Sequence, residues 1–177
     1  MTARAGETFR THRAVSDIEA LLALPLPSAG PTVSEGEPDT GEWTATAGEG
    51  FRLVPLWEGD SLTGVYGPEW NDAEEAAEQH LAALVTELDT RWGGHRPVSM
   101  RVPLFRHQAA DPMPPLFQAL CDEDCYGDLA VWGPVTAEPD AGRRWVGISV
   151  NQSDGDAPMI IVAVVSGAPV TELDERP

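Results

Sequence analysis

The strongest constraint on the fold is an apolar stripe that recurs at helical spacing over Ala77–Trp92. Apolar residues stand there at i, i+4, i+7, i+8, i+11 and i+15, which is one face of an α-helix. Glutamates precede the stripe, Arg91 lies near its end, and Gly93 follows it, an order that suits the helix dipole and a glycine stop. The pattern predicts a helix over residues 72–92 that packs one face on a core.

Two shorter helices are predicted on either side of this segment. Ser16 and Glu19 have the spacing of a capping box, and Pro25 would end the helix that follows, so a helix is expected over residues 17–24. A proline-rich lead introduces the second short helix, over residues 115–121.

Strand patterns fill most of the remaining chain. Pro55 indicates an edge position or a bulge in the first of them. Residues 159–165 are apolar on both faces, which predicts a central strand. The predicted strands are 51–57, 62–66, 98–104, 129–135, 144–151 and 159–166. The expected fold class is therefore α+β, a single domain with a mostly antiparallel sheet of about five strands and the long helix on one face.

Composition divides the chain into three parts. Residues 1–50 are expected to form an N-terminal arm with a short helix, and residues 28–50 to be an acidic flexible loop with a strand near Trp43–Thr46. Gly, Pro, Ser, Thr and Glu dominate that loop, and they bury too little apolar surface to offset the entropy of ordering. Residues 51–166 form the α+β core domain, and residues 167–177 are an acidic tail.

The charge is strongly negative. The chain has 29 acidic and 11 basic residues, a formal net charge of −18, and every basic residue is arginine. Such a charge repels nucleic acid and anionic membranes and attracts basic proteins over a Debye length of about 8–10 Å. No apolar run approaches the ~18 residues of a membrane span. We expect a cytoplasmic protein that binds a protein partner, with a basic one favoured by charge, and neither nucleic acid nor membrane.

The segment Cys121–Cys125 encloses three consecutive carboxylates. A structural zinc site needs a second pair of ligands, which the sequence lacks, and no calcium-loop spacing surrounds the carboxylates, so we expect no metal and no cofactor. The carboxylates are instead expected to form a solvated loop that meets a partner, with the adjacent Tyr126 as an anchor. Trp145, next to Arg143 and Arg144, is a separate candidate surface anchor. The candidate protein-binding residues are Asp122, Glu123, Asp124, Tyr126 and Trp145.

Residues 90–110 contain four arginines, two histidines and no carboxylate. Guanidinium groups bind carboxylates and phosphates through two hydrogen bonds, so this arginine-rich strand, over residues 91–107, is a candidate anion site. Pairing of the same arginines with the chain's many Asp and Glu residues is the favoured explanation of the pattern. The candidate anion-binding residues are Arg96, Arg101, Arg106 and His107.

No catalytic motif of useful specificity is present: the chain lacks a Gly-x-Ser-x-Gly elbow, a His-Glu-x-x-His pair and a glycine-rich phosphate loop. In size and composition it resembles the small acidic α+β proteins that neutralise toxins or act as adaptors in bacterial gene clusters. We therefore expect a non-catalytic, protein-binding protein of a bacterium, of the immunity, inhibitor or adaptor type. The alternatives are a small enzyme or metabolite-binding protein that uses the arginines, and a subunit of an obligate assembly.

Overall fold

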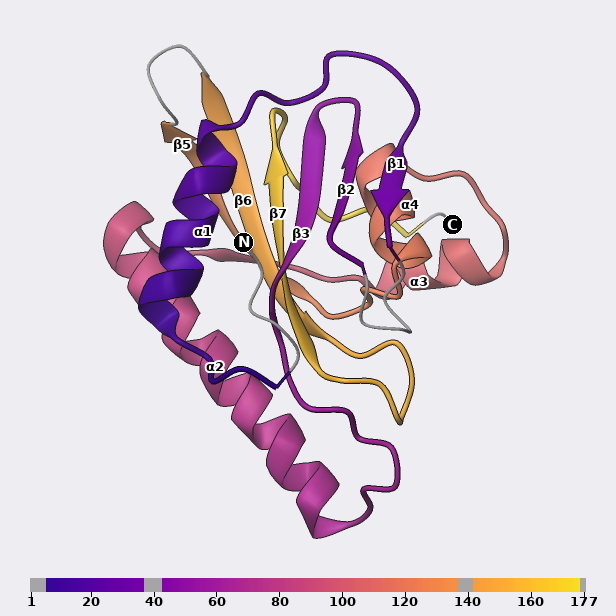
Figure 1. Cartoon of the computed structure of the whole chain (residues 1–177). Coiled ribbons are helices and arrows are strands. Elements are labelled where there is room, and N and C mark those ends of the chain that lie inside the picture. Colours follow the sequence, from indigo (N-terminus) through magenta and orange to yellow (C-terminus); the bar gives the residue numbers. More distant parts are fainter. Residues whose placement is uncertain (1–5, 37–42, 137–141, 176–177) are drawn as a thin grey trace.

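A computed structural model describes residues 6–36, 43–136 and 142–175 of the chain. These residues form four helices and one sheet of seven strands (Figure 1). In chain order the elements are α1 (Thr11–Ala23), β1 (Val33–Glu35), β2 (Ala45–Gly48), β3 (Phe51–Glu58), α2 (Pro68–Trp92), β4 (Arg96–Val98), α3 (Arg101–Gln108), α4 (Pro115–Asp122), β5 (Leu129–Thr136), β6 (Arg143–Asn151) and β7 (Ile160–Ser166).

The sheet has the strand order β1-β2-β3-β7-β6-β5-β4, and every neighbouring pair is antiparallel. This confirms the predicted α+β fold, with seven strands where about five were expected. The predicted central strand is β7, which pairs with β3 on one side and β6 on the other. Pro55 lies in β3 next to a register shift, so the bulge was predicted correctly, whereas an edge position was not.

Helices α1 and α2 cover one face of the sheet (Figure 1). The predicted stripe of α2 is confirmed, because Leu84 and Leu88 are fully buried against the sheet residues Ile148 and Ile161. The first half of α2 continues past the end of the sheet (Figure 1). That overhang carries the candidate site described below.

The opposite face of the sheet is covered as well, which the sequence patterns did not predict. Phe117 and Leu120 of α4 are buried there with Leu53 of β3 and Val162 of β7. Two covered faces explain why β7 is apolar on both sides. Within the described part of the chain, no helix combines the length and the apolar character that crossing a bilayer requires.

The two N-terminal helix boundaries differ from those predicted. Helix α2 begins at Pro68, after Gly67 with a φ of 59°. Residues 62–66 form a loop with a turn, so the strand predicted there is wrong, and the Gly-Pro pair expected to close it starts the helix instead. Proline suits the first helical position, where its missing N–H costs no hydrogen bond. Helix α1 begins at Thr11, which places the predicted capping serine, Ser16, inside the helix. Burial of Ala14 and Val15 extends the apolar stripe of α1 by one turn.

The predicted strand over residues 98–104 is wrong beyond its first residue. Strand β4 ends at Val98 and helix α3 begins at Arg101. Pro103 lies in the first turn of α3, where a helix tolerates proline. The arginine-rich segment is therefore mostly helical.

The segment predicted as an acidic flexible loop contains β1 and β2, which pair with each other and, through β2, with β3. Trp43 is buried with only 5 % of its surface exposed, and its indole nitrogen donates to Thr46 Oγ1 at 2.9 Å. Residues 37–42 lie outside the described residues, and the flexibility of the loop stays a prediction.

Candidate functional site

The end of the molecule beyond the sheet is formed by two segments, residues 59–78 and 152–158, which we call the acidic tip. They are distant in sequence but joined by hydrogen bonds. The backbone N–H of Leu62 donates to the carbonyl of Asp156 (3.0 Å), and the indole of Trp70 donates to the carbonyl of Gly155 (3.2 Å). The loop after β3, the start of α2 and the turn between β6 and β7 therefore form one surface.

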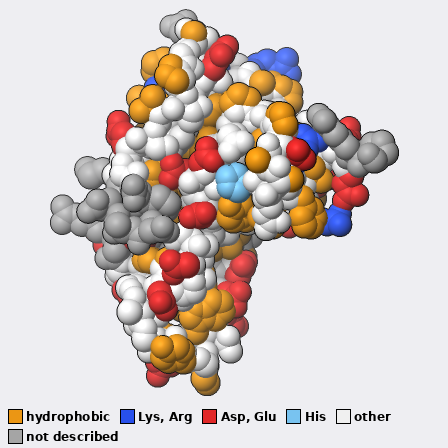
Figure 2. Space-filling view, turned by 90° about the vertical axis from the view of Figure 1, so that its right-hand side faces the viewer, with side chains coloured by type: hydrophobic (Ala, Val, Ile, Leu, Met, Phe, Trp, Pro, Cys, Tyr) orange, Lys and Arg blue, Asp and Glu red, His pale blue; other side chains and the backbone are white. Residues whose placement is uncertain are grey.

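Carboxylates dominate this surface, and neither segment contains an arginine or lysine. Seen from the side, the lower end of the molecule shows acidic and hydrophobic side chains and no basic ones (Figure 2). Like charges gathered without a counter-charge give a negative potential that attracts cations and basic proteins. The acidic residues of the tip are Asp60, Glu69, Asp72, Glu74, Glu75, Glu78, Asp154 and Asp156.

An exposed aromatic side chain accompanies these charges. Tyr66 precedes α2 and is 79 % exposed, the highest value among the exposed large hydrophobic residues of the described chain. Trp70, one turn into α2, is half-buried. Tyrosine and tryptophan are enriched at protein interfaces because they bury large apolar areas while keeping a polar group. The tip thus combines the two features expected of a surface that binds a basic protein.

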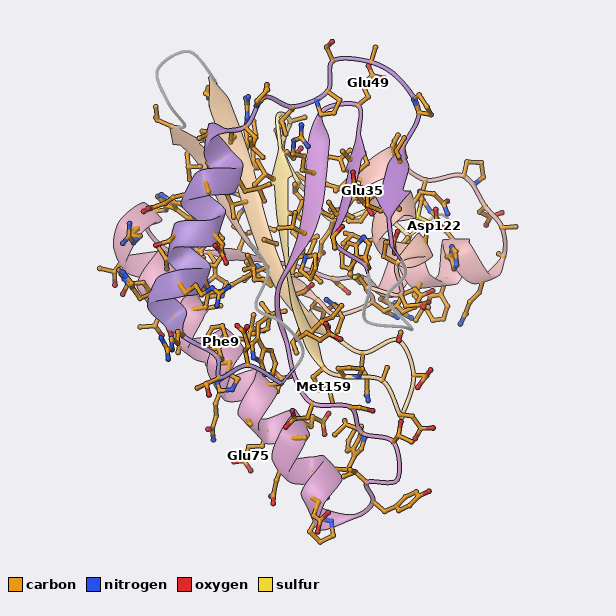
Figure 3. All side chains as sticks on the ribbon, viewed as in Figure 1. Phe9, Glu35, Glu49, Glu75, Asp122 and Met159 are labelled. Carbon is orange, nitrogen blue, oxygen red and sulfur yellow. The ribbon has the colours of Figure 1, made fainter. Side chains whose placement is uncertain are left out.

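A pocket of about 410 Å³ opens within the tip. The loop contributes Asp60 and Ser61, and α2 contributes Glu69. Trp57 comes from β3, and Met159 directly precedes β7. Figure 3 labels Met159, which lies where β7 meets the loop, and Phe9, which lies between β3 and α2. The pocket has mainly apolar walls and carries carboxylates contributed by the loop and by α2.

His80 forms part of the pocket wall and is packed among rings. Its imidazole stacks on Phe9 with 4.7 Å between centroids and meets Trp57 edge-on at 5.0 Å. Burial lowers the pKa of His80 below its ordinary value, so the ring is neutral at pH 7. The charge of the pocket therefore comes from Asp60 and Glu69.

Glu58, the last residue of β3, is buried to 9 % exposure, and burial raises the pKa of its carboxyl group. A raised pKa means that this group favours the folded state below the unfolded pKa of about 4.3 and loses that contribution as pH rises through the folded pKa. Glu58→Gln is expected to raise the free energy of unfolding at pH 7, because an uncharged side chain avoids the desolvation that penalises the buried carboxylate. The gain should shrink toward pH 4, measured by denaturant unfolding at both pH values.

The exposed Glu49→Gln is the matched control and should change stability little at either pH. A gain from Glu58→Gln of the same size at pH 4 and pH 7 would exclude the buried charge as its cause.

The acidic loop predicted to meet a partner is only partly available. Glu123 is buried to 6 % exposure and accepts a hydrogen bond from Thr46 Oγ1 (3.1 Å), so the prediction of a solvated side chain is wrong there. Asp122 is exposed and accepts a hydrogen bond from Gln118 Nε2 at 2.8 Å. Asp124 has a positive φ of 56°, as the chain turns away from the end of α4.

Neither of the two predicted aromatic anchors, Tyr126 and Trp145, is fully exposed. Trp145 is 8 % exposed and belongs to the second core, the hydrophobic cluster between α4 and the sheet. The expectation of an exposed indole is therefore wrong. Its side chain does point away from the first core, but the second face of the sheet is covered too. Tyr126 is half-buried against that second core, with its ring 6.2 Å from the ring of His107.

Cys121 and Cys125 are free and buried. Burial, aided by the neighbouring acids, raises the pKa of Cys121 to about 11 and raises the pKa of Cys125 as well. Both thiols are therefore protonated at pH 7, which is the unreactive form. Both cysteines serve as small residues of the hydrophobic cluster on the α4 side of the sheet.

The four candidate anion-binding residues do not form one site. Arg96 lies in β4 and donates to the carbonyl of Gly133 at 3.5 Å. Arg101 forms an ion pair with Glu175. Arg106 donates to the carbonyl of Asp174 at 3.1 Å.

The fourth residue, His107, lies in α3, and its Nδ1 is 3.5 Å from Gln118 Nε2. Two residues of the acidic tail, Asp174 and Glu175, contact arginines of α3. Pairing within the chain therefore accounts for the contacts of Arg101 and Arg106. Residues 176–177 lie outside the described residues.

Within residues 6–36, 43–136 and 142–175, no three His, Cys, Asp or Glu side chains are grouped so that they could hold a metal ion. In the pocket, the interactions of His80 with other described residues are ring contacts, and no hydrogen bond links it to Ser61 or Asp60. General-base catalysis would require such a bond or a water in its place.

The glutamates at the start of α2 were predicted to stabilise the helix, and no site was predicted at the tip. The available signal was the stretch from Arg52 to Arg91, which contains carboxylates and no cation. What the sequence could not show is that Asp154 and Asp156 join the same surface.

Comparison with known proteins gave no match: no protein-family model, no curated protein and no solved structure is similar to this chain. Function is therefore inferred from the fold and from the geometry of the tip.

Proposed function

We propose that this chain is a non-catalytic protein that binds a basic protein partner through its acidic tip. The observation that carries the proposal is that two distant segments, which contain carboxylates and no arginine or lysine, join into one surface that also exposes Tyr66. Electrostatic attraction of this kind speeds association and selects partners of opposite charge. An immunity, inhibitor or adaptor role in a bacterium is the biological setting that we propose for it.

The alternatives have less support in the structure. Anion binding by the arginines is opposed by the acidic tail, which already contacts Arg101 and Arg106. An obligate assembly would be favoured by tryptophans exposed at strand edges. The tryptophans Trp43, Trp57, Trp132 and Trp145 are buried, whereas Trp70 and Trp92 are half-buried.

The proposal is tested by affinity capture from the native host with three baits. One is the unaltered chain, the second is a tip variant, Asp72→Asn/Glu75→Gln/Asp156→Asn, and the third is a control variant, Glu35→Gln/Glu49→Gln/Asp122→Asn. All six residues are exposed, and both variants lose the same number of charges.

A partner with a basic surface should be captured by the unaltered chain and by the control variant and lost with the tip variant. Equal capture by all three baits would show that the tip is not the binding surface.

A further inference from the structure

We infer that the pocket of the acidic tip receives a long cationic side chain, lysine or arginine, presented by the partner. This inference rests on the proposed function and names what the partner places in the site. The pocket is a built cavity of about 410 Å³, larger than a gap between packed side chains, and it opens on the surface that carries the acidic groups.

The walls of the pocket suit the stem of such a side chain. Leu62, Val65 and Met159 provide apolar contact, and Ala73 and Ala76 keep the α2 side open because their side chains are small. Lysine and arginine bury their methylene stems along apolar surface while the charged group remains near polar atoms.

The charge at the pocket suits the head group. Asp60 and Glu69 line the pocket from the loop and from α2, and among the described residues neither forms an ion pair. Trp57 adds an indole ring, a preferred partner for a cation. A metal ion fits the pocket less well than a lysine or arginine side chain, because the described residues offer no cluster of three His, Cys, Asp or Glu ligands.

The test uses N-acetyl-arginine amide and N-acetyl-lysine amide, titrated into the full chain while the indole NMR signal of Trp57 is followed. N-acetyl-citrulline amide, which has a shape close to arginine but no charge, is the ligand control. Saturable binding of both cationic amides with a Kd in the millimolar range is expected, with no saturable shift from citrulline.

Two variants separate the charge of the pocket from its space. Asp60→Asn/Glu69→Gln should weaken binding at least about tenfold, since each lost ion contact is worth a factor of several. Ala76→Leu keeps every charge and fills the cavity, so it should also abolish binding. The matched control Glu35→Gln/Glu49→Gln removes two exposed charges that lie outside the acidic tip and should leave the Kd within about twofold.

An unmoved Trp57 signal with both cationic amides, or binding that survives Ala76→Leu, would overturn the inference. These outcomes are distinct from failure of the proposed function. Loss of partner capture in the tip variant Asp72→Asn/Glu75→Gln/Asp156→Asn does not depend on the pocket, because none of those residues lines it.

Discussion

Leu120→Ala is expected to lower the free energy of unfolding by about 2–5 kcal/mol, the usual cost of removing a fully buried leucine side chain. Leu120 lies in α4 and has no exposed surface, although its helix is only eight residues long. The cost combines the lost transfer free energy with the cavity left behind. Denaturant unfolding followed by tryptophan fluorescence measures it.

Leu84→Ala, on the other face of the sheet, provides the comparison, and a similar cost is expected because Leu84 is equally buried. Leu24→Ala is the control: Leu24 is 46 % exposed, and its replacement should cost no more than about 0.5 kcal/mol. A cost for Leu120→Ala as small as that for Leu24→Ala would contradict the second core.

The tip variant Asp72→Asn/Glu75→Gln/Asp156→Asn is expected to associate about tenfold more slowly than the unaltered chain with a short peptide of alternating arginine and alanine at low ionic strength. The control variant Glu35→Gln/Glu49→Gln/Asp122→Asn has the same net charge and should change the rate less than about twofold. Glu35, Glu49 and Asp122 lie far from Glu75 (Figure 3), so the comparison reports the position of the charges.

Stopped-flow fluorescence measures these rates over a series of salt concentrations. The difference between the two variants should disappear near 1 M salt, where the Debye length is about 3 Å. Equal slowing in both variants would show that total charge alone sets the rate. A rate independent of salt would remove the electrostatic basis of the proposal.

The periodicity of apolar residues was sufficient to predict those helices and strands whose local structure is decided by burial. The stripe that contains Leu84 and Leu88 predicted α2, and the two apolar faces of residues 159–165 predicted the central strand β7. These patterns are long, and no competing local signal interrupts them.

The segment that became α3 shows why shorter patterns failed. Alternation from Val98 onward fits a strand, but the backbone N–H of Met100 donates to Asp128 Oδ1 and that of Ser99 donates to Glu172 Oε1, each at 2.8 Å. These acceptors come from distant parts of the chain and satisfy the N–H groups where the helix begins. No local pattern contains that information.

The candidate site was missed for a related reason. The carboxylates of α2 are visible in the sequence. Because the helix dipole also favours acidic residues at a helix start, helix stabilisation alone explained them and no binding surface was inferred. The surface arises only when Trp70 and Leu62 bond to the turn between β6 and β7. Glu123 was predicted to be solvated because it lies in a run of three carboxylates. Its burial depends on the hydrogen bond that it accepts from Thr46, a residue distant in the chain, which the sequence does not show.

The central claim is that the acidic tip is the surface that binds a basic partner. Its most direct test is a titration of the isotope-labelled chain with the arginine–alanine peptide, followed by backbone amide NMR. The amide shifts are predicted to change chiefly over residues 59–78 and 152–158, with smaller changes elsewhere. Changes centred on residues 122–126, or spread evenly over the exposed acids of the chain, would contradict the claim.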